Sequence, residues 1–123
     1  MDSILTSIKK LLGIAEDYTA FDVDVTIFIN TAIASLTQIG VGPEVGFSVV
    51  TKDDTWTDWL GVLPNLESVK NYVYLSTRLI FDPPSNSAVV KLYQESIREL
   101  EFRIMVTVAP PSVVEPVIEE EVW

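Results

Sequence analysis

The side chains that could carry chemistry in this 123-residue chain are mostly carboxylates, because the sequence contains no histidine and no cysteine. The commonest general base and metal ligand is therefore missing. Disulfides, thiolate metal sites and thiol nucleophiles are missing with it. Two acidic groups come closest to a metal site: Asp22 with Asp24, and Asp53 with Asp54 and Asp58.

Neither acidic group has the spacing that a cation requires. Asp22 and Asp24 are two residues apart in a predicted helix, where their side chains point about 200° apart. The run from Asp53 to Asp58 lacks the glycine and the terminal glutamate of an EF-hand loop. The sequence also lacks a phosphate-binding glycine loop, a serine nucleophile elbow and a basic aromatic patch. We therefore expect no catalytic residue, no cofactor site and no metal site.

Composition indicates a protein that associates with other chains. The apolar share is 48% and the mean hydropathy is +0.31, so we expect some apolar surface to be buried between copies of the protein. The net charge of −10 excludes wrapping DNA through its phosphates, although an acidic wall could surround DNA without holding it. The sequence has no run of 18 apolar residues, and its N-terminus lacks the pattern of a signal peptide.

The elements that would position any site are helices. Apolar residues at three- and four-residue spacing predict helices over 2–13, 22–39, 65–82 and from Ser85 or Asn86 to Met105. Pro83 and Pro84 separate the last two, which form an antiparallel hairpin at the centre of the chain. A strand over 25–30 is the competing prediction, because that stretch is rich in β-branched residues. The fold class is mainly α: a small four-helix bundle with a short extended segment in the 43–60 loop and an extended C-terminal tail.

The same spacing predicts which side chains are buried. We expect Thr77 and the charged residues of the hairpin to lie mostly outside its buried faces. The residues expected on the buried faces are Ile4, Leu5, Ile8, Leu11 and Leu12; Val25, Phe28, Ile29, Ala32, Leu36 and Ile39; Leu66, Val69, Tyr72, Val73, Leu75, Leu79 and Ile80; and Val89, Val90, Tyr93, Ile97, Leu100 and Ile104.

Two tryptophans stand out between the second and third of these helices. Trp56 and Trp59 are three residues apart, in a stretch that could form one helical turn capped by Thr55. They could seal the core or anchor a partner, since tryptophan is enriched at interface hot spots.

The sequence divides into a helical domain over 1–106 and a tail over 107–123. The tail has four acids, no base, three prolines and no helical period, so we expect it to be extended. Apolar tails of this kind can order on binding, by strand addition or by filling a groove. The candidate partner-binding residues of the chain are Trp56, Trp59, Val113, Val114, Val117, Ile118, Val122 and Trp123.

The order and spacing of several segments resemble the head–tail connector proteins of long-tailed bacteriophages, also called adaptor or head completion proteins. The resemblance covers roughly residues 1–106, and no single motif carries it. The segments involved are Ile4 to Ile14, Phe21 to Asn30, Gly40-Val41-Gly42-Pro43, Gly46-Phe47, Trp56-Thr57-Asp58-Trp59-Leu60, Val69 to Pro84 and Leu92 to Arg103.

The resemblance implies a structural virion protein without enzymatic activity, present in the host cytoplasm before assembly. It implies a ring, twelvefold in the virion, that sits under the portal protein, extends the DNA channel and receives a stopper or tail-completion protein. It also implies that the segment from Met105 to Trp123 faces the portal, and that the 43–60 loop meets a neighbouring subunit or the channel. The alternatives are another phage neck protein, such as a stopper or a tail terminator, a generic acidic helical interaction module, and a metal-dependent enzyme.

Overall fold

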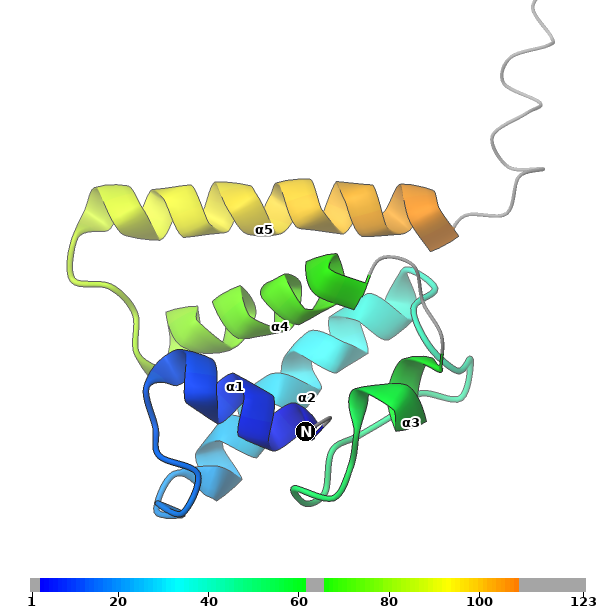
Figure 1. The fold of residues 1–123 in the computed structure, drawn as a ribbon. Helices are drawn as coiled ribbons and strands as arrows, with labels where there is room; N and C mark the ends of the chain where they lie inside the picture. Colours follow the sequence, from blue (N-terminus) through cyan, green and yellow to red (C-terminus); the bar gives the residue numbers. More distant parts are fainter. Residues whose placement is uncertain (1–2, 62–65, 109–123) are drawn as a thin grey trace, which may run out of the picture.

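The computed structural model describes residues 3–61 and 66–108, and within these ranges the chain is helical (Figure 1). The mainly α fold class is confirmed. The helices are α1 (Ile4–Leu12), α2 (Asp22–Gln38), α3 (Trp56–Leu60), α4 (Leu66–Phe81) and α5 (Ser87–Val108).

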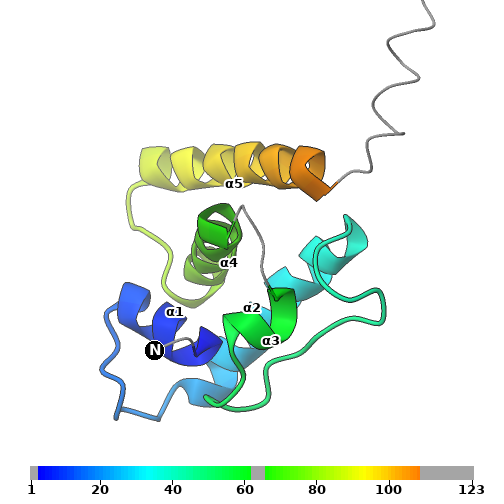
Figure 2. The ribbon, with the colours of Figure 1, turned by 45° about the vertical axis from the view of Figure 1, so that its right-hand side comes forward.

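The helices form layers around α4. Figure 2 shows α4 nearly end-on, with α5 on one side of it and α1 and α2 on the other. In agreement with this view, α4 packs against α2, α5 and α1, and α1 also packs against α2. The first arm of the predicted hairpin, α4, is therefore central in the fold. The second arm, α5, forms an outer layer.

Local side-chain chemistry sets the ends of the helices. Ser3 caps α1 by accepting a hydrogen bond from the backbone N–H of Thr6 at 3.1 Å, and Gly13 ends the helix in the left-handed region at φ 83°. Asn86 caps α5 by accepting from the N–H of Ala88 at 2.8 Å. The single turn α3 has a capping box in which Thr55 and Asp58 bond to each other's backbone N–H.

One core lies between α4 and the elements beneath it. Its members are almost all residues that the sequence predicts to be buried, together with residues of the 41–59 region. The buried apolar side chains are Ile4, Leu5, Ile8, Val25, Ile29, Ala32, Ile33, Leu36, Val41, Val49, Trp56, Trp59, Val69, Tyr72, Val73 and Ile104. Ile104 is the one residue of α5 in this group, and Ile97, Leu100 and Val108 are partly buried and pack against it.

The structure corrects three of the burial predictions. Ile80 is 52% exposed and Leu11 is 51% exposed, because each lies in the last turn of its helix, beyond the neighbours that cover the earlier turns. Thr77 is fully buried instead of facing outward, since it lies four residues after Val73 on the same side of α4. Lys9, which is not among the residues predicted to be buried, is also buried.

The alternative strand over 25–30 is wrong, because these residues lie inside α2. The 43–60 loop contains the expected non-helical stretch at 46–50, followed by a turn around Lys52 and Asp53. The described residues contain no β-strand, and their one β-bridge joins Ser3 to Thr55. Asn65, the first residue of the helix predicted over 65–82, and the tail beyond Val108 lie outside the described residues.

Candidate interaction surfaces

Trp56 and Trp59 lie together inside the core, with 1% and 2% of their surface exposed. Their rings stack with centroids 6.0 Å apart, and the ring of Phe47 stacks on Trp59 at 6.1 Å. The indole N–H of Trp56 donates to the hydroxyl of Ser7 at 3.2 Å, and the ammonium of Lys70 lies 5.6 Å from the Trp56 ring centre. The two tryptophans thus attach α3 and the preceding segment to α1, and direct contact of either ring with a partner stays a prediction.

The segment before α3 approaches Trp59 so closely that one position requires glycine. Gly42 has φ 79°, and a Cβ placed there would lie 2.4 Å from Nε1 of Trp59. Among the described residues, this indole N–H has no hydrogen-bond acceptor. The backbone at Gly42 therefore packs against the Nε1 edge of the Trp59 ring.

Polar contacts fix the same segment to α2 and to α1. The Asn30 side chain donates to the Val49 carbonyl at 2.9 Å and accepts from the Val49 N–H at 2.7 Å. The Asp54 carboxylate accepts from the N–H groups of Thr51 and Val50, and these bonds lower the pKa of Asp54 below its ordinary value. The Asp54 carbonyl accepts from the N–H of Ile4 at 3.0 Å. The 41–55 segment is consequently an ordered wall beside α2.

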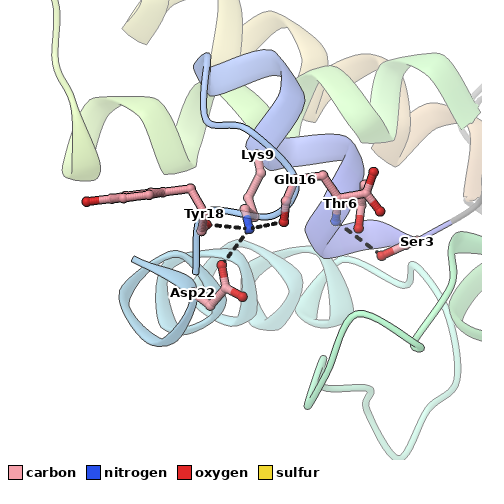
Figure 3. Close-up of polar contacts among 6 residues, drawn as sticks. All are labelled: Ser3, Thr6, Lys9, Glu16, Tyr18 and Asp22. Atoms are coloured by element: carbon pink, nitrogen blue, oxygen red, sulfur yellow. Dashed lines mark hydrogen bonds and ion pairs between the residues drawn. The ribbon is translucent and has the colours of Figure 1, made fainter. Parts of the chain in front are cut away.

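A buried lysine organises the connector between α1 and α2 (Figure 3). The Lys9 ammonium lies 2.8 Å from a carboxylate oxygen of Asp22, and donates to the carbonyls of Glu16 at 3.0 Å and Tyr18 at 2.8 Å. Three acceptors match the three donors of the ammonium group. The start of α2 and the connector are therefore held against α1 by one cation.

A second row of side chains on α2 faces the 41–55 wall. The row follows a four-then-three spacing and points away from α4: Val23, Ile27, Asn30, Ala34 and Thr37. The spacing of this row is visible in the sequence, but the stronger apolar stripe on the other side of α2 obscures it.

Two hollows lie between this row and the wall, one on each side of the Asn30–Val49 contact. The first, of about 400 Å³, is lined by Ala34, Thr37 and residues 45–48. The second, of about 470 Å³, is lined by Leu5, Thr19, Asp22, Val23, Thr26, Ile27, Val50, Thr51 and Lys52. Val23, Ile27 and Val50 are all exposed there, so the second hollow presents apolar surface. We call the two hollows together the α2 groove.

Apolar side chains are also exposed at two further places. The outer face of α5, away from α4, carries Leu92, Phe102, Met105 and Val106 among charged residues. Beside the segment that connects α1 to α2, the ring centre of Phe21 lies 5.7 Å from that of Tyr18 and 5.2 Å from that of Phe81. We call these three rings the connector cluster. Figures 1 and 2 show the segment that connects α1 to α2 on the other side of the molecule from α5. The molecule thus has two separate candidate contact surfaces besides the α2 groove.

The acidic groups do not assemble into a metal site. Within residues 3–61 and 66–108, no three His, Cys, Asp or Glu side chains are placed to share an ion. Asp22 is committed to Lys9, and Asp54 and Asp58 are committed to backbone N–H groups. No helix of the described part is both long and apolar enough to cross a membrane. The candidate residues Val113, Val114, Val117, Ile118, Val122 and Trp123 lie outside the described residues.

The described residues form a small helical bundle with separate exposed apolar surfaces. Residues 4–110 match the family described as phage connector protein, and the chain belongs to this family. Its members are structural components of the virion rather than enzymes. Comparisons with curated proteins and with solved structures gave no significant match.

Proposed function

We propose that this protein is a head–tail adaptor, which forms a ring beneath the portal protein, extends the DNA channel and links the head to the tail. The match to the connector family over 4–110 is the observation that carries the proposal. On this reading the protein waits in the host cytoplasm and joins the virion neck during assembly. Its partners are further copies of itself, twelve in the virion ring, the portal protein, and a stopper or tail-completion protein.

The placement of apolar surface supports a ring. A closed ring needs two different surfaces on each subunit, because each copy meets its neighbours head to tail. The α5 outer face and the connector cluster are two such surfaces, and they are built from different elements of the molecule. The buried tryptophans would act indirectly in this contact, by fixing the 41–55 wall rather than by touching the neighbour.

The charge supports the channel role. The chain has a net charge of −10, with 18 acidic and 8 basic residues, so DNA passing through a ring of such subunits would meet repulsion rather than a binding site. The helical fold argues against the alternative of a stopper or tail terminator, which we expect to be rich in strands. The family match argues against a generic helical interaction module.

A pull-down with the portal protein of the same phage tests the adaptor role. Helix α5 ends at Val108, so a chain that stops there keeps the helix and removes the tail. We expect the full chain to bind the portal and the shortened chain to lose binding while keeping its circular dichroism spectrum. Failure of both chains to bind would refute the adaptor role, and equal binding would refute the portal contact of the tail.

The ring contact is tested separately. Phe102 is 63% exposed on the α5 outer face, so Phe102→Glu should leave the fold intact and prevent ring formation in the presence of the portal. The matched control is Leu11→Glu, which changes an exposed apolar residue of α1 that belongs to neither candidate contact surface. Rings of Phe102→Glu in negative-stain images, as abundant as those of the control, would exclude this surface from the subunit contact.

A further inference from the structure

We propose that the α2 groove is a peptide-binding surface whose ligand is the chain's own C-terminal segment, residues 109–123. The structure leaves the groove unfilled by any described residue, although one of its two hollows exposes three apolar side chains. The ligand is thus an extended apolar peptide with an acidic end, and it is covalently attached to the protein that binds it.

The end of α5 delivers this segment to the groove. Val108, the last described residue, lies beside Gly40, since a Cβ placed on Gly40 would be 3.4 Å from Cγ2 of Val108. Gly40 follows the C-terminal end of α2, where the first hollow begins at Thr37 and Ala34. The fifteen residues from 109 to 123 could extend about 50 Å, while α2 is about 26 Å long. The segment therefore has ample length to run back along α2.

The spacing of the apolar pairs in the segment matches the spacing of the hollows. The α2 residues that line the two hollows are centred about eleven positions apart, which is about 16 Å along the helix. Val113 and Val114 precede Val117 and Ile118 by four positions, which is about 13 Å in an extended chain. The first pair would occupy the hollow at Ala34, and the second would occupy the hollow at Ile27.

Charge and backbone chemistry favour the same placement. With Ile118 in the second hollow, the acids Glu119, Glu120 and Glu121 come next to Lys52, a lining residue of that hollow and the only base of the 41–61 region. Phe47 and Ser48 in the wall donate no backbone hydrogen bond to another described residue. An extended, β-branched segment can pair with such free N–H groups in the manner of strand addition.

Disulfide trapping in the full chain tests the docking, because the natural sequence has no cysteine to compete. The trapping pair is Val50→Cys with Glu119→Cys, and the control pair is Leu92→Cys with Glu119→Cys. Val50 and Leu92 are both exposed apolar residues. Leu92 lies on α5 outside the α2 groove, although an undocked tail would be long enough to reach it. With oxidised glutathione, we expect the trapping pair to form its intramolecular disulfide about tenfold faster than the control pair, because docking raises the local concentration of one thiol near the other.

A groove-blocking substitution shows whether the hollow is responsible. Ile27→Glu places a charge in the second hollow at an exposed helix position, and it should abolish the rate advantage of the trapping pair while circular dichroism stays unchanged. Leu11→Glu, its matched control at an exposed position of α1, should leave the advantage intact. Equal rates for the two cysteine pairs, or no effect of Ile27→Glu, would overturn the proposal. Disulfide-linked dimers in place of cyclised monomers would overturn the intramolecular form and assign the groove to the tail of a neighbouring copy.

The docking does not depend on the portal contact proposed above, and the two can fail separately. Trapping reports only on the isolated protein, whereas the pull-down reports only on the portal. A tail that docks in the groove and is dispensable for portal binding would refute the portal contact alone.

Discussion

Replacement of Lys9 by methionine is the sharpest test of how the fold holds its first two helices together. Methionine keeps a long apolar side chain in the buried site but removes the ammonium group. The Asp22 carboxylate and the carbonyls of Glu16 and Tyr18 then lose their shared donor. Breaking a buried ion pair from one side costs about 3–5 kcal/mol. The Asp22 side chain is 30% exposed and can recover some hydration, so we expect a loss nearer 2–4 kcal/mol.

The matched control is Lys10→Met, because Lys10 is the neighbouring residue of the same helix and is exposed. We expect that change to stay within about 0.5 kcal/mol. Urea unfolding followed by tryptophan fluorescence measures both, and Lys9→Met should also lower the melting temperature by roughly 10–20 °C. A double-mutant cycle with Asp22→Asn separates the pair from the carbonyl contacts. If Lys9→Met and Lys10→Met had equal midpoints, the lysine would not organise the connector, and this account of it would be wrong.

Three further predictions follow from other contacts. Gly42→Ala should destabilise the protein by about 2–4 kcal/mol, because the new Cβ would meet Trp59. The control Gly13→Ala is also at a positive φ but faces open space, so it should cost about 1 kcal/mol. Chemical denaturation measures both changes in the free energy of unfolding. Asn30→Ala should lose about 2 kcal/mol in the same assay and increase hydrogen exchange at Val49. Burial raises the pKa of the Tyr72 hydroxyl above its ordinary value of 10.0, and the charge of Glu101 adds a smaller contribution. The stabilisation from the neutral hydroxyl is therefore complete below pH 10.0 and is lost as the pH rises through the elevated pKa. Tyr72→Phe should remove that alkaline loss from a pH series of unfolding curves.

The helix boundaries were predictable because each depends on a few neighbouring residues. Ser3 and Asn86 have side chains that satisfy free N–H groups, and Gly13 adopts a backbone conformation that other residues avoid. The pair Pro83 and Pro84 prevents α4 from continuing under any tertiary arrangement. Such signals do not require knowledge of what packs against the helix.

Burial at helix ends could not be predicted in the same way. Ile80 continues the apolar spacing of α4 but extends past its neighbours, and Thr77 is buried although its side chain is polar. The role of Lys9 depends on two carbonyls of a connector whose path is set by tertiary packing. Periodicity identifies the direction in which a side chain points, while the arrangement of the other elements decides what it meets there.

The α2 groove illustrates the same limit on a functional feature. The row from Val23 to Thr37 has a regular spacing, but its importance comes from the 41–55 wall opposite it. The wall exists because Asn30 binds Val49 and because Gly42 approaches Trp59, and neither contact has a local sequence signal. The tryptophans were identified as important from the sequence, and the structure shows what they support.

The outer position of α5 has a mechanical consequence. This helix is about 33 Å long, it contacts the rest of the protein mainly through α4, and any partner that holds residues beyond Val108 pulls on it. A force along the helix axis is shared by all the α4–α5 contacts at once, so they must shear together. A force across the axis opens the contacts one turn at a time, starting at Ile104 and ending at the two prolines. The direction of tension on the tail would therefore decide whether this subunit resists a load or unzips under it.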